Sequence, residues 1–324
     1  MRGSTPEDVR LALRAATMYY LDGLTQAQIA ARLGVSRPTA GRLVARAKAK
    51  GLVRIDVAVP SDMRDDLHAD EERELERRFG LTEAVVAGHG VDVGAPGRPA
   101  SFASVGRAAA ALLMRRLAPD DVLGFTWGPE QVAVANALMP GVASCRAVVQ
   151  LDGAMSTAAY QTGTEFILSR CADTLRAATL RLPAPLYADP STVVSMRSDS
   201  VISRTLEAGR RADLMLFGVG AVSTSTTLFE GSYLDTRMLD ELMSLGAVGE
   251  IGGRFFDAQG TPVDTELQQR AVSVPLEDIR NCGKTLLISS GATKHQATLG
   301  ALRGKLARLL VCDIDCARWL LAQE

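Results

Sequence analysis

Residues 25–51 constrain the fold of this chain more than any other segment, because their spacing is typical of two short helices joined by a tight turn. Gly34 suits a left-handed turn between the helices, and Ser36 is a favourable N-cap for the second one. A helix over residues 6–21 would pack beneath the pair. The inward-facing apolar residues are Ile29, Ala30, Leu33, Val35, Ala40 and Leu43. The segment therefore predicts a helix-turn-helix.

The second helix of this motif carries polar residues on the side away from the apolar core, which is the side that a recognition helix presents to DNA. We predict that Arg37 and Arg42 read bases, because a guanidinium group can donate two hydrogen bonds to guanine. Ser36, Thr39 and Lys48 would contact phosphates. The expected partner is double-stranded operator DNA.

The charge of this region favours DNA binding over simple solvation. Residues 25–55 hold seven Lys or Arg and no Asp or Glu, whereas the whole chain has a net charge of −1. Such a local excess of positive charge is typical of a surface that binds phosphates. The alternative is a solvated helix with an ordinary content of basic residues.

With 324 residues the chain is long enough for two domains. We expect a DNA-binding domain over residues 1–59, in which residues 52–59 alternate like a short strand and form a wing. Residues 60–80 carry Glu and Arg at helical spacing and predict a linker helix, either a dimer contact or a solvated connector. Residues 81–324 would form an effector-binding domain.

The second domain has the rhythm of an α/β fold, in which apolar strands alternate with amphipathic helices. Predicted strands lie at residues 84–87, 121–125, 147–151, 214–219, 285–289 and 308–311, and predicted helices at 101–117, 129–138, 291–302 and 316–321. This order predicts a Rossmann-like, mainly parallel sheet with helices on both faces. Such sheets bind ligands at the carboxyl ends of their strands.

Glycine-bounded turns follow four of these strands, at residues 124–130, 151–154, 218–222 and 289–295. Thr126, Gly128, Gly153 and Gly220 are candidate effector contacts, because glycine lets a ligand approach the backbone and its N–H groups closely. The alternative is that the glycines serve only the geometry of the turns.

Lys294 is a sharper candidate, because it lies at a helix start where the helix dipole disfavours a cation. A bound phosphate or carboxylate would reverse that penalty, while an exposed lysine in water is the alternative. Glu130 lies at another helix start, where the dipole stabilises it and it would repel phosphate. The anion is therefore expected near Lys294 and not against Glu130.

Residues 246–263 place three charged side chains between turn signals. Glu250 and Asp257 would accept hydrogen bonds from sugar hydroxyls, and Arg254 would pair with an acid or reach an anion. An internal salt bridge is the alternative. Trp127 would either contact the ligand or simply pack.

The five cysteines are odd in number and widely spaced, which favours buried free thiols. No metal site is expected, since the three histidines lie near neither one another nor a cysteine pair, and no cofactor is predicted. No apolar run is long enough to cross a bilayer. The expected location is the cytoplasm.

The chain resembles the SorC family of sugar-binding transcriptional regulators, whose DNA-binding end is similar to that of DeoR-type repressors. The matching segments are residues 19–57, 121–128, 151–154, 218–222, 246–263 and 290–304. The resemblance implies an effector domain similar to phosphosugar isomerases and CoA transferases, which senses a phosphorylated sugar or polyol, and assembly into homodimers or homotetramers.

By this resemblance, Thr126 and Gly128 would approach the phosphate or the sugar, Glu250 and Asp257 the hydroxyls, and Lys294 the phosphate. The chain departs from the family pattern at three places. Pro129-Glu130 replace a small hydroxyl residue, Asp152 replaces an amide, and Gly41 replaces a recognition-helix serine. The first two leave open an unphosphorylated or differently charged effector.

The expected function is a DNA-binding regulator, not an enzyme, whose operator binding is controlled by a sugar, sugar phosphate or polyol. The alternative is a sugar-phosphate isomerase-like enzyme with an accessory DNA-binding domain, in which Asp257 and Glu250 act as acid and base. Only His295 among the histidines lies near the candidate site, and no compact catalytic pair stands out. A nucleotide-binding protein is not favoured, because no Walker loop or GxGxxG follows the first strand.

Overall fold

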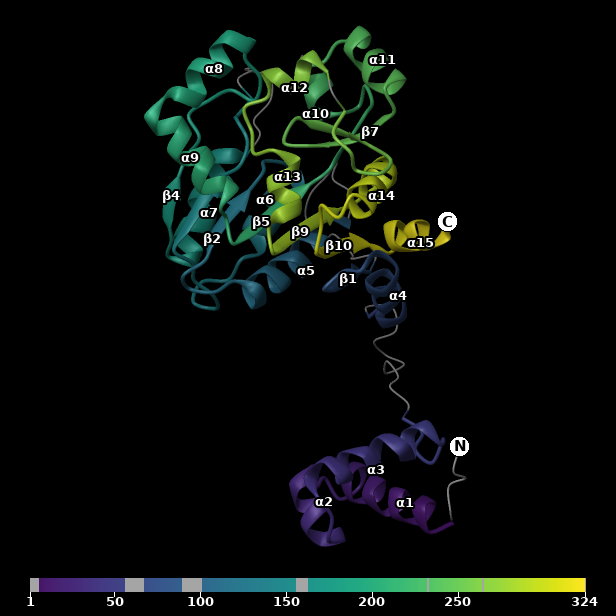
Figure 1. Ribbon diagram of the computed structural model, residues 1–324. Coiled ribbons are helices and arrows are strands. Elements are labelled where there is room, and N and C mark those ends of the chain that lie inside the picture. Colours follow the sequence, from purple (N-terminus) through teal and green to yellow (C-terminus); the bar gives the residue numbers. More distant parts are fainter. Residues whose placement is uncertain are drawn as a thin grey trace. The chain divides into compact units, whose positions relative to one another are not determined.

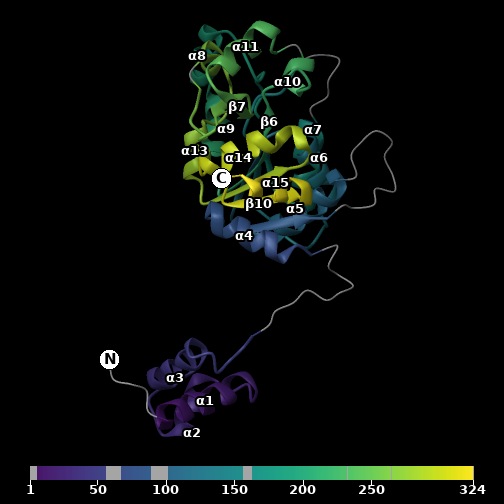
Figure 2. The same ribbon diagram turned by 90° about the vertical axis from the view of Figure 1, so that its right-hand side faces the viewer.

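The computed structural model describes residues 6–55, 67–88, 101–155, 163–231, 233–263 and 265–323. The chain divides into two compact units, Met1–Pro60 and Ser61–Glu324 (Figures 1 and 2). Each unit has its own apolar core. In the described ranges, no helix has both the length and the apolar character needed to cross a membrane.

The N-terminal unit contains α1 (Pro6–Tyr20), α2 (Gln26–Leu33) and α3 (Arg37–Ala49). Thr25 and Gln28 form a capping box at the start of α2, and Gly34 ends this helix with φ 66°. Ser36 caps α3 by accepting a hydrogen bond from the Thr39 N–H. The core contains Ala12, Ala15, Ile29, Ala40 and Leu43. The predicted helix-turn-helix is confirmed.

The predicted wing is not visible in the described part of this unit. Residues 52–55 form no strand, and residues 56–59 lie outside the described residues.

The second unit is built on a parallel sheet, and the predicted fold class is confirmed. Within the described residues, its seven strands lie in the order β1-β10-β9-β5-β2-β3-β4. All of its neighbouring strands pair in parallel. The strands are β1 (Glu83–Ala87), β2 (Val122–Phe125), β3 (Ala147–Gln150), β4 (Ala178–Leu180), β5 (Leu214–Gly218), β9 (Lys284–Ser289) and β10 (Leu309–Asp313). The short edge strand β4 was not predicted.

Helices cover both faces of this sheet (Figures 1 and 2). Leu214 and Leu216 of β5 pack on one side and Met215 and Phe217 on the other, as the alternation of side chains along a strand requires. One face carries α5 (Ser101–Arg116), α6 (Pro129–Ala137) and α7 (Thr164–Leu175). The other carries α4 (Ala69–Phe79), α9 (Ser200–Arg210), α13 (Leu276–Asn281), α14 (His295–Arg303) and α15 (Ile314–Ala322). All five cysteines are buried and free, as predicted.

A smaller antiparallel sheet lies beside the strand ends, formed by β6 (Gly220–Ala221), β7 (Ala247–Ile251) and β8 (Arg254–Asp257). Gly252 and Gly253, with φ 55° and 75°, make the turn between β7 and β8. Around it are α10 (Thr227–Glu230), α11 (Thr236–Ser244), α12 (Glu266–Arg270) and the 3-10 turn Ala292–Lys294, and α8 (Pro190–Ser198) packs against α9 and α12. Residues 246–263, in which the sequence placed three charged side chains between turn signals, therefore contain the β7-β8 hairpin.

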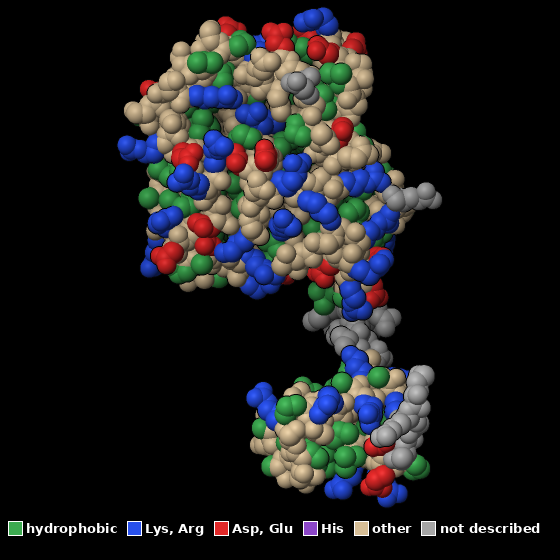
Figure 3. Space-filling model, viewed as in Figure 1, with side chains coloured by type: hydrophobic (Ala, Val, Ile, Leu, Met, Phe, Trp, Pro, Cys, Tyr) green, Lys and Arg blue, Asp and Glu red, His purple; other side chains and the backbone are tan. Residues whose placement is uncertain are grey.

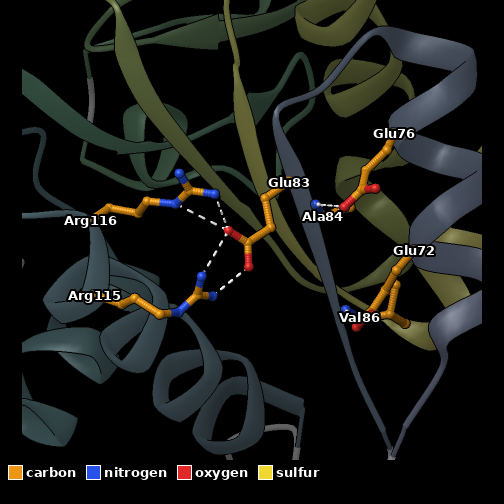
Figure 4. A network of polar contacts seen from close by, with 7 residues as sticks. All are labelled: Glu72, Glu76, Glu83, Ala84, Val86, Arg115 and Arg116. Carbon is orange, nitrogen blue, oxygen red and sulfur yellow. Dashed lines mark hydrogen bonds and ion pairs between the residues drawn. The ribbon is translucent and has the colours of Figure 1, made fainter. Parts of the chain in front are cut away.

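The helix expected within residues 60–80 is part of the second unit and is not a free connector. Leu75 and Phe79 of α4 are buried against the sheet. Glu72 and Glu76 accept hydrogen bonds, each of 3.0 Å, from the N–H groups of Val86 and Ala84 in the edge strand β1 (Figure 4). Because edge N–H groups otherwise invite pairing with another chain, α4 closes this edge of the sheet.

Glu83, on the same strand, binds two arginines of α5 (Figure 4). The hydrogen bond from Arg115 lowers the pKa of Glu83, and the hydrogen bond from Arg116 lowers it further. A carboxylate with a lowered pKa stabilises the fold above its unfolded pKa, and this contribution is lost as the pH falls through the folded pKa. Glu83→Gln should therefore lower the free energy of unfolding by about 1–2 kcal/mol at pH 7.

Urea denaturation between pH 3 and pH 7 measures this effect. The difference between Glu83→Gln and the native chain should shrink below pH 4.5, the ordinary pKa of glutamate. Glu74→Gln is the control, since the Glu74–Arg77 pair lies within one exposed turn of α4 and should matter little. A loss of equal size at pH 3 and pH 7 would contradict the role assigned to the Glu83 charge.

Candidate functional site

The sheet reverses its strand order between β2 and β5. From β2 the chain continues through β3 to β4, and β5 then returns on the other side of β2. Open parallel sheets bind ligands outside the carboxyl ends of their strands at such a point. A cavity of about 210 Å³ lies here. Its lining includes Thr126, Trp127, Gly128, Glu130, Gln131, Asp152, Gly220, Ser223, Ser225, Thr226, Glu250 and Lys294.

Five of the predicted effector contacts lie in the wall of this cavity: Thr126, Gly128, Gly220, Glu250 and Lys294. These residues follow strands β2, β5 or β9 of the large sheet or belong to the small sheet. The fold therefore gathers them from distant parts of the sequence.

Gly153 and Asp257 do not line the cavity. Gly153 is small for a structural reason, because a Cβ there would collide with the backbone carbonyl of Pro185. Asp257 accepts hydrogen bonds of 2.9 and 2.8 Å from the N–H groups of Gln259 and Thr261. Its carboxylate therefore holds the turn after β8, and the predicted contacts of both residues with an effector are corrected.

Arg254 and Trp127 also have structural partners. The Arg254 guanidinium is buried and donates to the carbonyls of Ala271 and Ser273, at 3.3 and 2.8 Å. Trp127 lines the cavity while its indole N–H donates to the Gly153 carbonyl at 3.0 Å. The tryptophan therefore holds two of the strand-end turns together.

The ammonium group of Lys294 forms an ion pair with the carboxylate of Glu130. The Lys294 side chain is 19% exposed and that of Glu130 only 2%, so the pair is shielded from water. This arrangement corrects the expectation that an anion lies near Lys294 and away from Glu130. The two residues start different helices of the same sheet edge, and the anion beside Lys294 is Glu130 itself.

Glu250 lies opposite Gly220 in the small sheet. A Cβ at Gly220 would collide with the Glu250 carboxylate, so the glycine leaves room for this acid. Glu250 accepts a hydrogen bond of 2.7 Å from the Gly253 N–H. Burial raises the pKa of Glu250, although this hydrogen bond and the charge of Lys294 oppose the shift.

Asp152 and Gln131 complete the polar wall and were not among the predicted contacts. Burial raises the pKa of Asp152 well above its usual range, and the charge of Glu250 raises it further. Asp152 directly follows β3, so its position at a strand end was a usable signal. Gln131 lies in the first turn of α6 and is marked only by being a polar residue on a buried helix face.

A charged carboxylate at Asp152 is expected to lower the stability of the folded chain. With its folded pKa raised, the unfolded chain releases the Asp152 proton at a lower pH than the folded chain, so stability falls as the pH rises through this interval. Asp152→Asn removes the titrating group and should raise the free energy of unfolding at pH 7 by about 1–3 kcal/mol.

The gain should vanish below pH 3.8, the ordinary pKa of aspartate, where both states are protonated. Chemical denaturation at several pH values measures it, with Asp173→Asn on the exposed side of α7 as the control. A loss of stability at pH 7 would show that the Asp152 charge is needed in the fold.

Ser36 caps α3, and the other candidate DNA-binding residues, Arg37, Thr39, Arg42 and Lys48, lie along this helix. Arg37, Arg42 and Lys48 are exposed. The Arg42 guanidinium donates to the Thr39 hydroxyl at 3.2 Å, and the Thr39 and Ser36 hydroxyls are hydrogen bonded at 2.9 Å. Lys and Arg side chains outnumber Asp and Glu on the face of this unit in view (Figure 3). Three groups that can bind a nucleic-acid backbone or a base edge are thus linked before DNA arrives.

Family models and known proteins give a consistent picture. A family model described as "Putative sugar-binding domain" matches residues 66–322, and one described as "MarR family" matches residues 16–64. The "Deoxyribonucleoside regulator" of Bacillus subtilis (strain 168) is 32% identical over 315 residues, which cover 97% of this chain and 98% of that protein.

Two further relatives also match over nearly their whole length. The "Erythritol catabolism regulatory protein EryD" of Brucella abortus is 28% identical over 98% of both chains. The crystal structure of the full-length sorbitol operon regulator SorC from Klebsiella pneumoniae matches with a TM-score of 0.71 and 27% identity, over 97% of this chain and 99% of that one. The chain therefore belongs to the SorC family of sugar-binding transcriptional regulators.

Proposed function

We propose that the chain is a transcriptional regulator that binds operator DNA through α3 and is controlled by a small carbohydrate held in the cavity at the strand ends. The observation that carries this proposal is that one chain contains both an exposed, acid-free α3 and a cavity with polar groups in its wall at the switch point of the sheet. Relatives named as regulators of sorbitol, erythritol and deoxyribonucleoside metabolism support it.

On the DNA side, Arg37 and Arg42 read base edges, and Ser36, Thr39 and Lys48 contact phosphates. The hydrogen bonds from Arg42 through Thr39 to Ser36 hold the first turn of α3 in a defined geometry. A recognition helix usually reads one half-site, and two copies together read an operator. The proposed assembly is therefore a homodimer or homotetramer, acting on DNA in the cytoplasm.

On the effector side, Thr126, Gly128, Gly220, Glu250 and Lys294 form the binding wall, and Asp152 joins them. Control requires that the effector binds one arrangement of the protein better than another. The cavity suits this role because four separate strand ends contribute to it, so a bound ligand would contact several of these elements at once.

The enzyme alternative loses one of its two proposed catalytic groups. Glu250 lines the cavity but Asp257 does not, because its carboxylate is used in the turn after β8. General acid and base groups must both reach the same substrate. A regulator without turnover therefore fits the cavity better, and incubation with sugar phosphates should give no product.

Operator binding is tested with fluorescently labelled duplexes from the DNA upstream of the protein's own gene. The full chain should bind one of these duplexes in the presence of excess random DNA, and a carbohydrate from a thermal-shift screen should change that affinity. Equal binding to all duplexes, or no binding at low salt, would contradict the proposal.

A further inference from the structure

The charges of the effector cavity set a condition on its ligand. Among the described lining residues, the cavity has three carboxyl groups, on Glu130, Asp152 and Glu250, and one ammonium group, on Lys294. That ammonium group is already paired with Glu130, which is almost completely buried and lies in the first turn of α6. A phosphate monoester would bring about −1.5 to −2 charges into this site.

The unpartnered atoms of the wall set a second condition, which is independent of the charges. Gln131 Oε1 and Asp152 Oδ1 are buried and have no hydrogen-bond partner among the described residues. Both residues line the cavity, and each is only 1% exposed. Leaving a buried acceptor unpaired is unfavourable, so both atoms favour a ligand that donates hydrogen bonds. The hydroxyl groups of a sugar or polyol are such donors, whether or not the compound also carries a phosphate.

We propose that the effector is an uncharged polyhydroxylated compound, a free polyol or sugar. Glu130 sets this preference, because its carboxylate is paired with the Lys294 ammonium group, to which a phosphate would otherwise bind. This inference rests on the proposed function and narrows its effector. The hydroxyls of Ser223, Ser225 and Thr226 add neutral hydrogen-bonding groups to the same wall. The volume of about 210 Å³ suits a compound of a few carbons with its hydroxyls.

The raised pKa values of Asp152 and Glu250 agree with this assignment. Each results mainly from burial, which favours the neutral carboxyl over the carboxylate. A neutral carboxyl can both donate to and accept from a ligand hydroxyl.

The test uses matched pairs of compounds with and without a terminal phosphate, measured with the full chain by calorimetry at pH 7. The pairs are erythritol, ribitol, sorbitol and deoxyribose, each with its phosphate monoester. At least one free compound should bind about tenfold or more tightly than its phosphate. Tighter binding of the phosphates by the native chain would overturn the inference while leaving a carbohydrate-controlled regulator intact.

Glu130→Gln tests the residue itself. Removing the carboxylate releases the Lys294 ammonium, so affinity for the phosphate of the binding pair should rise by about tenfold relative to its free form. Glu277→Gln on the exposed side of α13 is the control and should leave the ratio unchanged. Circular dichroism and the melting temperature verify the fold, and the native pairs decide the ligand class whatever the variant does.

The remaining outcomes are also decisive. If Glu130→Gln folds and the ratio stays as in the native chain, Glu130 does not set the preference. If the native chain binds operator DNA but none of the eight compounds, the assigned ligand class is wrong and DNA binding stands. If it binds neither, the proposed function itself fails.

Discussion

Lys294→Met should lower the free energy of unfolding by about 3–5 kcal/mol, because it leaves the carboxylate of Glu130 buried without a partner. Glu130 is 2% exposed and cannot turn out into water. The double variant Glu130→Gln/Lys294→Met removes both charges and should recover most of the loss. Denaturation in urea gives the four free energies of this cycle.

Lys284→Met is the matched control, because Lys284 begins strand β9 and Lys294 follows the end of the same strand. The ammonium of Lys284 binds Asp121 at 2.8 Å, but the Lys284 side chain is 39% exposed. Water can therefore replace much of that pair, and the expected loss is about 1 kcal/mol or less. If Lys294→Met costs no more than Lys284→Met, the Glu130 carboxylate does not depend on the ion pair.

Arg37→Ala combined with Arg42→Ala should weaken binding to the operator by about 2–6 kcal/mol, as each lost bidentate contact to a base costs about 1–3 kcal/mol. Both arginines are exposed and belong to an α3 whose core residues stay untouched, so the fold should persist. Fluorescence anisotropy with operator and scrambled duplexes at two salt concentrations measures the loss.

Two single variants separate reading of bases from attraction of phosphates. Lys48→Ala should weaken binding to all duplexes alike and reduce the salt slope by about 1. Arg14→Ala, on the exposed side of α1, is the control and should change little. If the variant without both arginines loses as much affinity for scrambled DNA as for the operator, Arg37 and Arg42 bind phosphates and do not read bases.

The sequence predicts the long elements of the second unit well, because their signals are local. Each of the six predicted strands is an apolar run that ends near a glycine or a polar turn, and all six are present in the large sheet. The strand β4 (Ala178–Leu180) escapes prediction because it has three residues, two of them exposed. The β7-β8 hairpin escapes because its glycines are equally typical of loops.

The functional details depend on the order of the strands, which no local pattern reveals. Glu130 and Lys294 are 164 positions apart, and the sequence relates each of them only to the dipole of its own helix. They meet because β2 and β9 both flank β5 in the sheet. Likewise, Glu72 and Glu76 have the spacing of a solvated helix, while their partners are backbone N–H groups of an edge strand.

The prediction for Asp257 failed for the opposite reason, because this polar residue near the predicted site has a purely local role. An aspartate two and four residues before turn N–H groups is a common way to hold a turn. Its carboxylate accepts from Gln259 and Thr261, so the local signal was sufficient to explain it. A polar residue in a turn is a better candidate for ligand binding when no N–H group follows within its reach.

The central claim is that the cavity and α3 belong to one regulated molecule, and reciprocal binding tests it most directly. The dissociation constant of the effector is measured with the full chain alone and with the chain saturated by operator duplex. We expect this constant to change by about 5–150-fold, by the same factor as the effector changes the operator affinity. An effector affinity that is the same with and without operator DNA would contradict it.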